Sequence, residues 1–96
     1  MIQTIIAAVK GKHVLTLIYG GLHRTIEPHA VGRTKAGHDV VRCYQIWGQH
    51  HTGQHDWDLL TVSKISNLQS TGHIFPGPRD KYKRGDKAMA HIYAEL

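Results

Sequence analysis

The chain has 96 residues, of which 41% are hydrophobic and 20% charged. This composition is typical of one folded globular domain and excludes the apolar-poor composition of a disordered chain. Twelve lysines and arginines against seven acidic residues give a formal net charge of +5 at pH 7, and such an excess favours anionic partners. No apolar run approaches the ~20 residues that cross a bilayer, and the start shows no secretory signal pattern. We therefore expect one soluble, cytoplasmic domain over residues 1–96, with no membrane partner.

Cys43 is the only cysteine, so an internal disulfide and a four-cysteine zinc site are both excluded. This single thiol suits a reducing interior. It lies within an apolar run, and we therefore expect a buried, inert thiol rather than a reactive one.

The first element is predicted to be a short amphipathic helix. One apolar face at helical spacing is formed by Ile2, Ile5, Ile6 and Val9. Gly11 follows as a stop signal. A helix of this length is not stable alone, so we expect its apolar face to pack against the rest of the domain.

After the helix the pattern changes to that of short strands. Val14 to Tyr19 is rich in apolar and β-branched residues, and the pair Gly20-Gly21 is a strong turn signal. Leu22 to Glu27 is predicted to return as the second strand of a hairpin, which Pro28 is expected to end. Further strands are predicted at 40–47, 57–62 and 67–75, and the polar stretch 48–56 is expected to be a loop.

The C-terminal part begins at Pro76-Gly77-Pro78, which is expected to interrupt regular secondary structure, and a basic arm follows. Asp86 resembles a helix N-cap. The helix predicted after it has apolar residues at Met89, Ile92, Tyr93 and Leu96. The sequence therefore predicts a mainly β domain of the α+β class, with a small antiparallel β-barrel or strongly bent sheet and a short helix at each end.

The basic arm is the first candidate binding site. Its positively charged and aromatic residues are Arg79, Lys81, Tyr82, Lys83, Arg84 and Lys87, and only Asp80 and Asp86 oppose their charge. Interleaved positive charge and an aromatic ring are what single-stranded nucleic acid binding uses, with charge for the backbone and a ring for a base. The alternative is a solvated arm that only caps the barrel, with Tyr82 packed inward.

Arg24, Arg42 and Tyr44 form a second candidate site. Arg42 and Tyr44 are two residues apart in a predicted strand, so their side chains project from the same face. Arg24 lies on a strand that could be close to them. Such a face could hold a phosphate and a base, or it could be the outer polar face of a barrel, and the sequence leaves both open.

Metal binding and catalysis are weaker alternatives. His50, His51 and His55 gather in a glycine-containing loop without a cysteine, and we expect adventitious metal capture rather than a native metal site or cofactor. The carboxylates Asp56 and Asp58 are interpreted as a solvated strand edge. No arrangement typical of nucleophilic or acid–base catalysis stands out, so the protein is expected not to be an enzyme. A small histidine-dependent nuclease is the weakest alternative.

Several motifs, taken in order along the chain, resemble those of the WYL domain family. They are a strand that ends in Tyr19, an Arg-x-x-x-Pro element at Arg24-Thr-Ile-Glu-Pro28, Gly37 ahead of the Val40–Tyr44 strand, the stretch from Trp57 to Ile65, and an ending with Phe75, Tyr82, Asp86-Lys-Ala-Met and Ile92-Tyr93. Asp39-Val40-Val41 stands where the family has Trp-Tyr-Leu. Thr61 and Ser63 also depart from the family pattern.

The resemblance implies an SH3-like or Sm-like β-barrel that binds nucleic acid or a nucleotide-like ligand as a regulatory module. Lys64 stands at a basic position of the family, where a lysine keeps the attraction for phosphate but lacks the bidentate fork of arginine. The alternative is a solvated surface lysine. Trp57, Leu59, Leu60 and Val62 are interpreted as core or half-buried strand residues.

The function predicted from the sequence is a non-enzymatic binding module for single-stranded nucleic acid or an anionic nucleotide-like ligand. The ligand-binding residues expected are Arg24, Arg42, Tyr44, Lys64, Arg79, Lys81, Tyr82, Lys83 and Arg84. The alternative is a protein-interaction or oligomerisation module that meets a protein partner or a second copy through its terminal helices.

Overall fold

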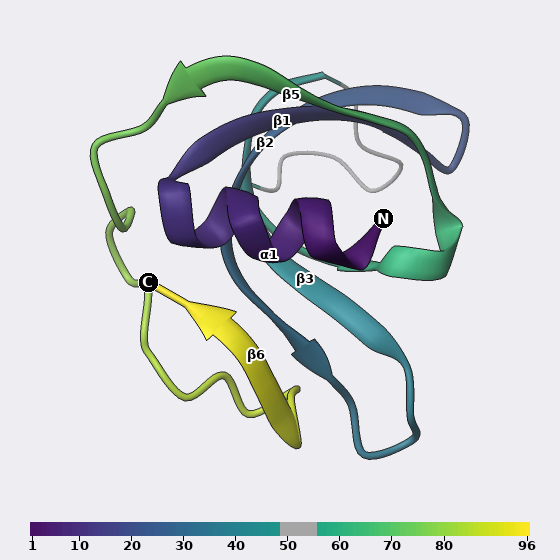
Figure 1. Cartoon of the computed structure of the whole chain (residues 1–96), viewed down its shortest axis with the longest axis vertical. Coiled ribbons are helices and arrows are strands. Elements are labelled where there is room, and N and C mark those ends of the chain that lie inside the picture. Colours follow the sequence, from purple (N-terminus) through teal and green to yellow (C-terminus); the bar gives the residue numbers. More distant parts are fainter. Residues whose placement is uncertain (49–55) are drawn as a thin grey trace.

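The computed structural model describes residues 1–48 and 56–96, in which strands dominate, as the sequence predicts (Figure 1). The elements in chain order are α1 (Ile2–Gly11), β1 (His13–Tyr19), β2 (Leu22–Arg33), β3 (Asp39–Gly48), β4 (Trp57–Thr61), the 3-10 turn η1 (Val62–Lys64), β5 (Ile65–Ile74) and β6 (His91–Glu95). The loop predicted at 48–56 falls almost entirely outside the described residues. None of the helices in these two ranges combines the length and apolar character that a membrane span requires.

Helix α1 forms where the spacing of apolar residues predicts it. Its buried side chains are Ile5, Ala8 and Val9, and they pack against β1, β2 and β6. The helix ends at Gly11, and Lys12 caps it in the left-handed conformation, with φ 56° and ψ 47°. The predicted N-terminal helix is therefore confirmed.

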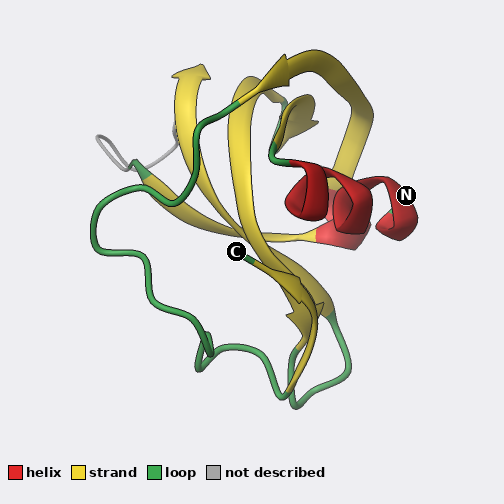
Figure 2. Cartoon of the chain, turned by 60° about the vertical axis from the view of Figure 1, so that its left-hand side comes forward, coloured by secondary structure: helices red, strands yellow, loops and turns green. Residues whose placement is uncertain are grey.

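The strands form one antiparallel sheet in the order β4-β3-β2-β1-β5, and β6 pairs with β2 beside this path. The sheet is strongly bent (Figures 1 and 2). Among the described residues β4 and β5 do not pair with each other, so the sheet stays open. The mainly β, α+β prediction is confirmed in its bent-sheet form.

Strand β2 lies at the centre of the sheet and does not end where the sequence predicts. Pro28 was expected to terminate it, but β2 continues to Arg33. Pro28 is tolerated because β2 changes its neighbour there: β1 pairs up to Ile26, and β6 only from Ala30 onward. Pairing with β3 is also irregular between Pro28 and Ala30. This irregularity is typical of a bulge, and it leaves His29 out of register.

The helix predicted at the C-terminus is wrong. After Asp86 the chain makes a turn, in which the Asp86 carbonyl accepts a hydrogen bond from the Met89 amide. Strand β6 then forms and pairs with the last residues of β2. This part of β2 would otherwise present an unpaired edge, and its pairing overrides the helical spacing of the apolar residues.

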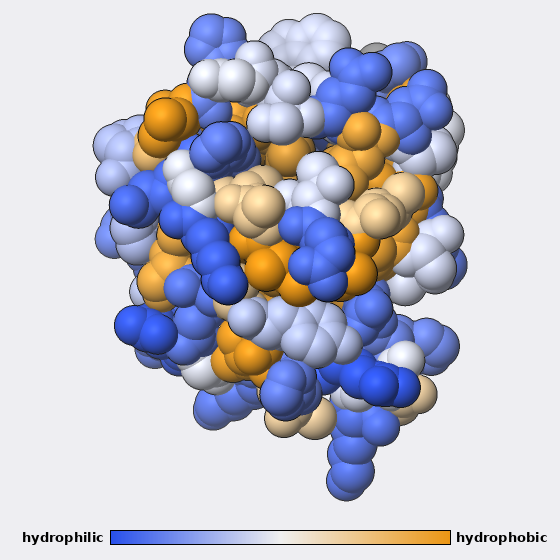
Figure 3. Space-filling model, in the orientation of Figure 1, coloured by the Kyte–Doolittle hydropathy of each residue, from blue (hydrophilic) through white to orange (hydrophobic). Residues whose placement is uncertain are grey.

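The two faces of the sheet are covered differently. One face carries α1 and the main core, which includes Leu15, Val41 and Leu60. Figure 3 views this side of the molecule, where apolar side chains reach the surface between hydrophilic ones. Residues 76–90, which we call the strap, connect β5 to β6 (Figure 2). The strap packs on the other face, which bears Arg42 and Tyr44.

A cationic aromatic pocket as the candidate functional site

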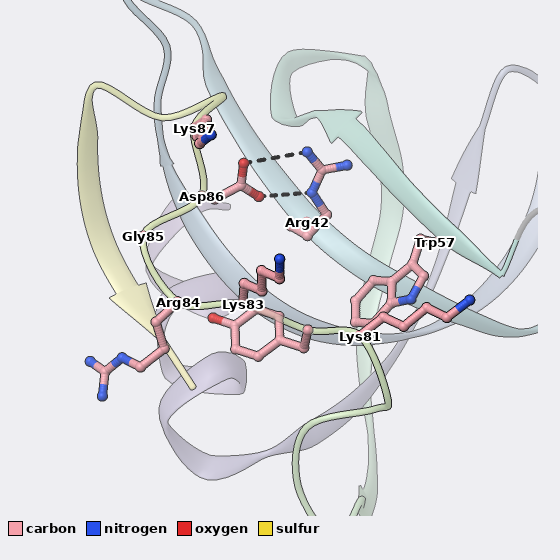
Figure 4. Close-up of a pocket in the computed structure, with 9 residues that line it drawn as sticks. Arg42, Trp57, Lys81, Lys83, Arg84, Gly85, Asp86 and Lys87 are labelled. Atoms are coloured by element: carbon pink, nitrogen blue, oxygen red, sulfur yellow. Dashed lines mark hydrogen bonds and ion pairs between the residues drawn. The ribbon is translucent and has the colours of Figure 1, made fainter.

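The strap and the sheet form a pocket of about 400 Å³. The sheet contributes Arg42 from β3 and Trp57 from β4, and the strap provides the opposite wall (Figure 4). The lining residues are Arg42, Trp57, Lys81, Tyr82, Lys83, Arg84, Gly85, Asp86 and Lys87. Five of these side chains are cationic and one is acidic, so the pocket suits an anion. Its volume falls within the range of small-molecule sites.

An aromatic cluster lies beside the pocket, and two of its rings, those of Trp57 and Tyr82, line it. The cluster consists of His29, Tyr44, Trp57, Phe75 and Tyr82. The rings of Trp57 and Tyr82 are nearly parallel, with centroids 6.2 Å apart and an interplanar angle of 21°. Tyr44 meets Trp57 edge to face at 5.3 Å. The His29 ring lies 4.8 Å from Trp57, 5.6 Å from Phe75 and 5.1 Å from Tyr82. These contacts fix the orientation of the two rings that line the pocket.

His29 joins the central strand to the strap. Its side chain is fully buried, and its Nε2 accepts a hydrogen bond of 3.0 Å from the Arg79 amide. Because Nε2 is an acceptor, Nδ1 carries the proton and donates to the Glu27 carbonyl at 2.8 Å. Burial lowers the pKa of His29 below its ordinary value. The ring is therefore neutral at pH 7, and both of its nitrogens are engaged.

Arg79 also fastens the start of the strap with its side chain. Its Nε and Nη2 donate to the two carboxylate oxygens of Glu27 at 2.7 and 3.2 Å. The guanidinium carbon lies 4.4 Å from the centroid of the Tyr44 ring. Bidentate pairing with a buried carboxylate and a cation–π contact are both stabilising. Arg79 thus anchors the strap and does not line the pocket.

An ion pair between Arg42 and Asp86 closes another side of the pocket (Figure 4). Nε of Arg42 donates to Oδ2 of Asp86 at 2.7 Å, and Nη2 donates to Oδ1 at 3.3 Å. Oδ1 also accepts from the Ala88 amide at 2.9 Å. The hydrogen bonds from Arg42 lower the pKa of Asp86, and Asp86 raises the pKa of Arg42. Both groups are therefore charged at pH 7.

The remaining cations of the pocket lie on the strap. Arg84 pairs with Glu95 of β6 at 3.0 Å. Lys81, Lys83 and Lys87 are exposed, and in the described parts of the chain no ion pair involves them. Their positive charges are available to a ligand.

Five of the nine predicted ligand-binding residues line the pocket together: Arg42, Lys81, Tyr82, Lys83 and Arg84. For Tyr82 the sequence left two alternatives open, a ring that binds a base or a ring packed inward, and the structure combines both positions. Tyr82 packs inward, with its hydroxyl donating to the His29 carbonyl at 3.3 Å, and it still lines the pocket. The basic arm therefore both covers the sheet and presents charge.

Arg24 lies apart from this group. Its side chain is 4% exposed and donates to Asp58 at 3.0 Å. Asp58 is in register with Cys43 on the neighbouring strand, and Cys43 belongs to the core under α1. Directly paired residues project to the same face, so this ion pair lies on the opposite face from Arg42 and Tyr44. Because Asp58 pairs with this buried arginine, it is not the solvated edge residue that the sequence predicts.

Two other predicted residues are also outside the pocket. Lys64 is exposed in η1, which follows the Thr61 end of β4, whereas Trp57 is at the beginning of that strand. Tyr44 is covered by the guanidinium of Arg79. Neither residue contributes to the lining.

The ligand-binding residues expected from the sequence leave out four residues of the pocket lining: Trp57, Gly85, Asp86 and Lys87. Sequence reasoning assigned Trp57 to the core and Asp86 to a helix cap, and it included Lys87 in the basic arm without naming it as a ligand-binding residue. Trp57 could have been recognised only from its position opposite Tyr44 in the β3–β4 pairing. The spacing of residues within one strand does not reveal that pairing.

The metal alternative rests on His50, His51 and His55, which lie outside the described residues. In the ranges 1–48 and 56–96 no group of three or more His, Cys, Asp or Glu side chains is placed to hold a metal ion. The absence of a native metal site stays a prediction.

Comparisons with known proteins add no relative. No protein-family model matches the chain, and searches of the curated proteins and of the solved structures find no match. Function must therefore be inferred from the chemistry of the pocket.

Proposed function

We propose that this protein is a non-enzymatic binding module for single-stranded nucleic acid or an anionic nucleotide-like ligand, with the pocket under the strap as its site. The observation that carries the proposal is the meeting of five cationic side chains with the rings of Trp57 and Tyr82 in one pocket. Cations attract phosphate, and aromatic faces stack on a base.

The proposal agrees with what the resemblance to the WYL domain family implies. Five residues within the resembling stretches line the pocket: Arg42, Trp57, Tyr82, Asp86 and Lys87. We infer a relationship to that family, although the basic position at Lys64 lies elsewhere. A regulatory role would follow from this relationship.

The chemistry of the pocket favours binding over catalysis. General acid–base catalysis needs a group that can exchange a proton with the substrate. His29 lies beneath the pocket with both ring nitrogens hydrogen-bonded within the fold, and Asp86 is paired with Arg42. We therefore propose no catalytic residue and no cofactor.

A protein-interaction or oligomerisation module is the second candidate, but not through terminal helices. Strand β6 stands in place of the predicted C-terminal helix, and α1 buries Ile5 and Val9 against the sheet. The observation that favours this candidate is instead the exposure of Ile46 and Trp47 at the end of β3, which are 42% and 67% exposed. Exposed aromatic side chains are common anchors of protein interfaces.

Tryptophan fluorescence can test the proposed site directly. The chain has two tryptophans, and Trp47 is not in this pocket. A Trp47→Phe background therefore leaves Trp57 as the reporter. We expect saturable quenching by a mononucleotide or a short single-stranded oligonucleotide at low salt.

Charge variants then locate the binding. Lys81→Ala and Lys83→Ala should each weaken oligonucleotide binding and flatten its logarithmic salt dependence by about 0.7. Lys10→Ala is the matched control, because this exposed lysine lies on α1, on the other face of the sheet. The proposal fails if neither ligand binds at low salt, or if Lys10→Ala reduces affinity as much as the pocket variants.

A further inference from the structure

We propose that Asp86 occupies, in the free protein, the place of the ligand's phosphate on Arg42, and that binding requires the phosphate to displace it. This inference rests on the proposed function and deepens it, because it assigns the anchor of the anionic group. It makes Asp86 an internal competitor that sets the affinity for anions.

The geometry of the pair supports this assignment. Two N–H groups of Arg42 point at the two oxygens of one carboxylate, at 2.7 and 3.3 Å. This is the fork arrangement with which arginine also holds a phosphate. Asp86 uses two of the five N–H donors of the guanidinium. Arg42 remains 30% exposed within the pocket lining, so an incoming anion can reach it.

The charge balance of the pocket also supports the displacement of Asp86 by a phosphate. Asp86 is the acidic residue of the lining, and the exposed lysines on the same wall of the pocket include Lys81, Lys83 and Lys87. A phosphate that takes the place of Asp86 on Arg42 can also interact with these lysines. The exchange therefore replaces one carboxylate contact by a phosphate contact and adds attraction from the strap.

Asp86 is held from its own side by the strap. The Ala88 amide donates to Oδ1, and the Met89 amide donates to the Asp86 carbonyl. These bonds keep the carboxylate close to Arg42 in the free protein. They also allow a conservative substitution, because an asparagine oxygen can accept the Ala88 amide while the negative charge is removed.

The test is a double-mutant cycle in the Trp47→Phe background. Asp86→Asn should tighten binding of adenosine monophosphate about tenfold, the value of one charge-assisted hydrogen bond. The gain for uncharged adenosine should be much smaller, because adenosine carries no phosphate that could occupy Arg42. In an Arg42→Gln background the gain in affinity from Asp86→Asn should largely disappear. Without the guanidinium of Arg42, the Asp86 carboxylate and the phosphate no longer compete for the same group.

Asp80→Asn is the matched control. Asp80 is an exposed acid of the strap whose Oδ1 accepts from the Lys81 amide, so its substitution removes the same charge without touching Arg42. Asp86→Ser, whose hydroxyl can also accept the Ala88 amide, serves if Asp86→Asn does not fold. A short oligonucleotide in place of the mononucleotide shows whether a strand phosphate makes the same exchange.

The outcomes separate this inference from the proposed function. Binding of the nucleotide by the parent protein, with no larger gain for Asp86→Asn than for Asp80→Asn, overturns the competitor and leaves the binding site standing. A gain that persists in the Arg42→Gln background also overturns it. Absence of nucleotide and oligonucleotide binding in every variant overturns both.

Discussion

The backbone amide of Arg79 donates a hydrogen bond of 3.0 Å to Nε2 of His29, across 50 residues of sequence. The bond ties the strap to the central strand, at a ring that also contacts Trp57 and Tyr82. Because one wall of the pocket depends on this ring, substitutions at His29 should change both the stability of the fold and the binding of ligand.

Replacing His29 is expected to destabilise the fold. His29→Ala removes a fully buried ring and leaves the Arg79 amide and the Glu27 carbonyl without their partner. The free energy of unfolding should fall by about 2–4 kcal/mol, measured by urea denaturation. His38→Ala is the control, because His38 is exposed in the turn between β2 and β3. A loss no larger than that of the control would contradict the anchoring role.

Stability should fall on mild acidification because of the same ring. The folded-state pKa of His29 is lowered by burial, so the unfolded chain takes up the proton first as the pH falls below its ordinary value of about 6.5. The contribution is fully present above that pH and is lost progressively below it. The ionisable side chains that face the ring are Glu27 from β2, and Arg79 and Tyr82 from the strap.

Urea titrations between about pH 7.5 and 5.5 test this window, because Asp and Glu side chains protonate mainly at lower pH. His29→Gln should show a flatter pH dependence than the parent protein, while His38→Ala should retain the parent slope. Equal slopes in all three proteins would show that His29 does not set the dependence.

Substitutions of two nearby cations of the strap should have different effects, one on the stability of the fold and the other on the binding of ligand. Arg79→Ala leaves the buried carboxylate of Glu27 unpaired, and the free energy of unfolding should fall by about 1–3 kcal/mol. Lys81→Ala should change stability by less than about 0.5 kcal/mol, since Lys81 is exposed, but it should weaken oligonucleotide binding. Urea denaturation and fluorescence titration of both variants check this. The reverse assignment of the two effects would contradict the structure.

Cys43 should be unreactive in the folded protein. Its side chain is fully buried, and burial raises the pKa of the thiol, with a further contribution from the charge of Asp58. A thiol reagent such as dithionitrobenzoate should therefore label Cys43 only as urea unfolds the chain. Prompt stoichiometric labelling in native buffer would show that the β3 side of the core is accessible.

Elements with local determinants could be predicted from the sequence. Helix α1 follows from the spacing of Ile5 and Val9 and from the stop signal at Gly11, and the β1–β2 hairpin follows from Gly20-Gly21. Strand β3 follows from its run of apolar and β-branched residues. Each of these signals lies within the element that it specifies.

The C-terminal strand could not be predicted in this way. The spacing of Ile92, Tyr93 and Leu96 also fits one face of a helix. The strand forms because β2 has a free edge from Ala30 onward, and that edge exists because Pro28 does not end the strand. The incorrect prediction that the strand ends at Pro28 therefore leads directly to the incorrect prediction of a C-terminal helix.

The pocket was predictable only where its residues are adjacent in sequence. Lys81, Lys83 and Arg84 could be recognised as one basic arm. Trp57 joins them through the register of β4 with β3 and the docking of the strap, as its contacts with Tyr44 and Tyr82 show. Arg24 was misplaced for the same reason, since the face to which a residue projects depends on register.

Because β2 changes its neighbour along one edge, β6 is not needed for the pairing of the five strands of the main path. Residues 1–74 contain α1 and the five strands of the main path, whereas the strap and β6 follow them in the chain. The pairing of β6 with β2 closes a long loop, as does the pairing of β5 with β1, and long-range pairings are expected to form slowly. A chain that lacks the strap would therefore lose one wall of the pocket while keeping the strands of the main path.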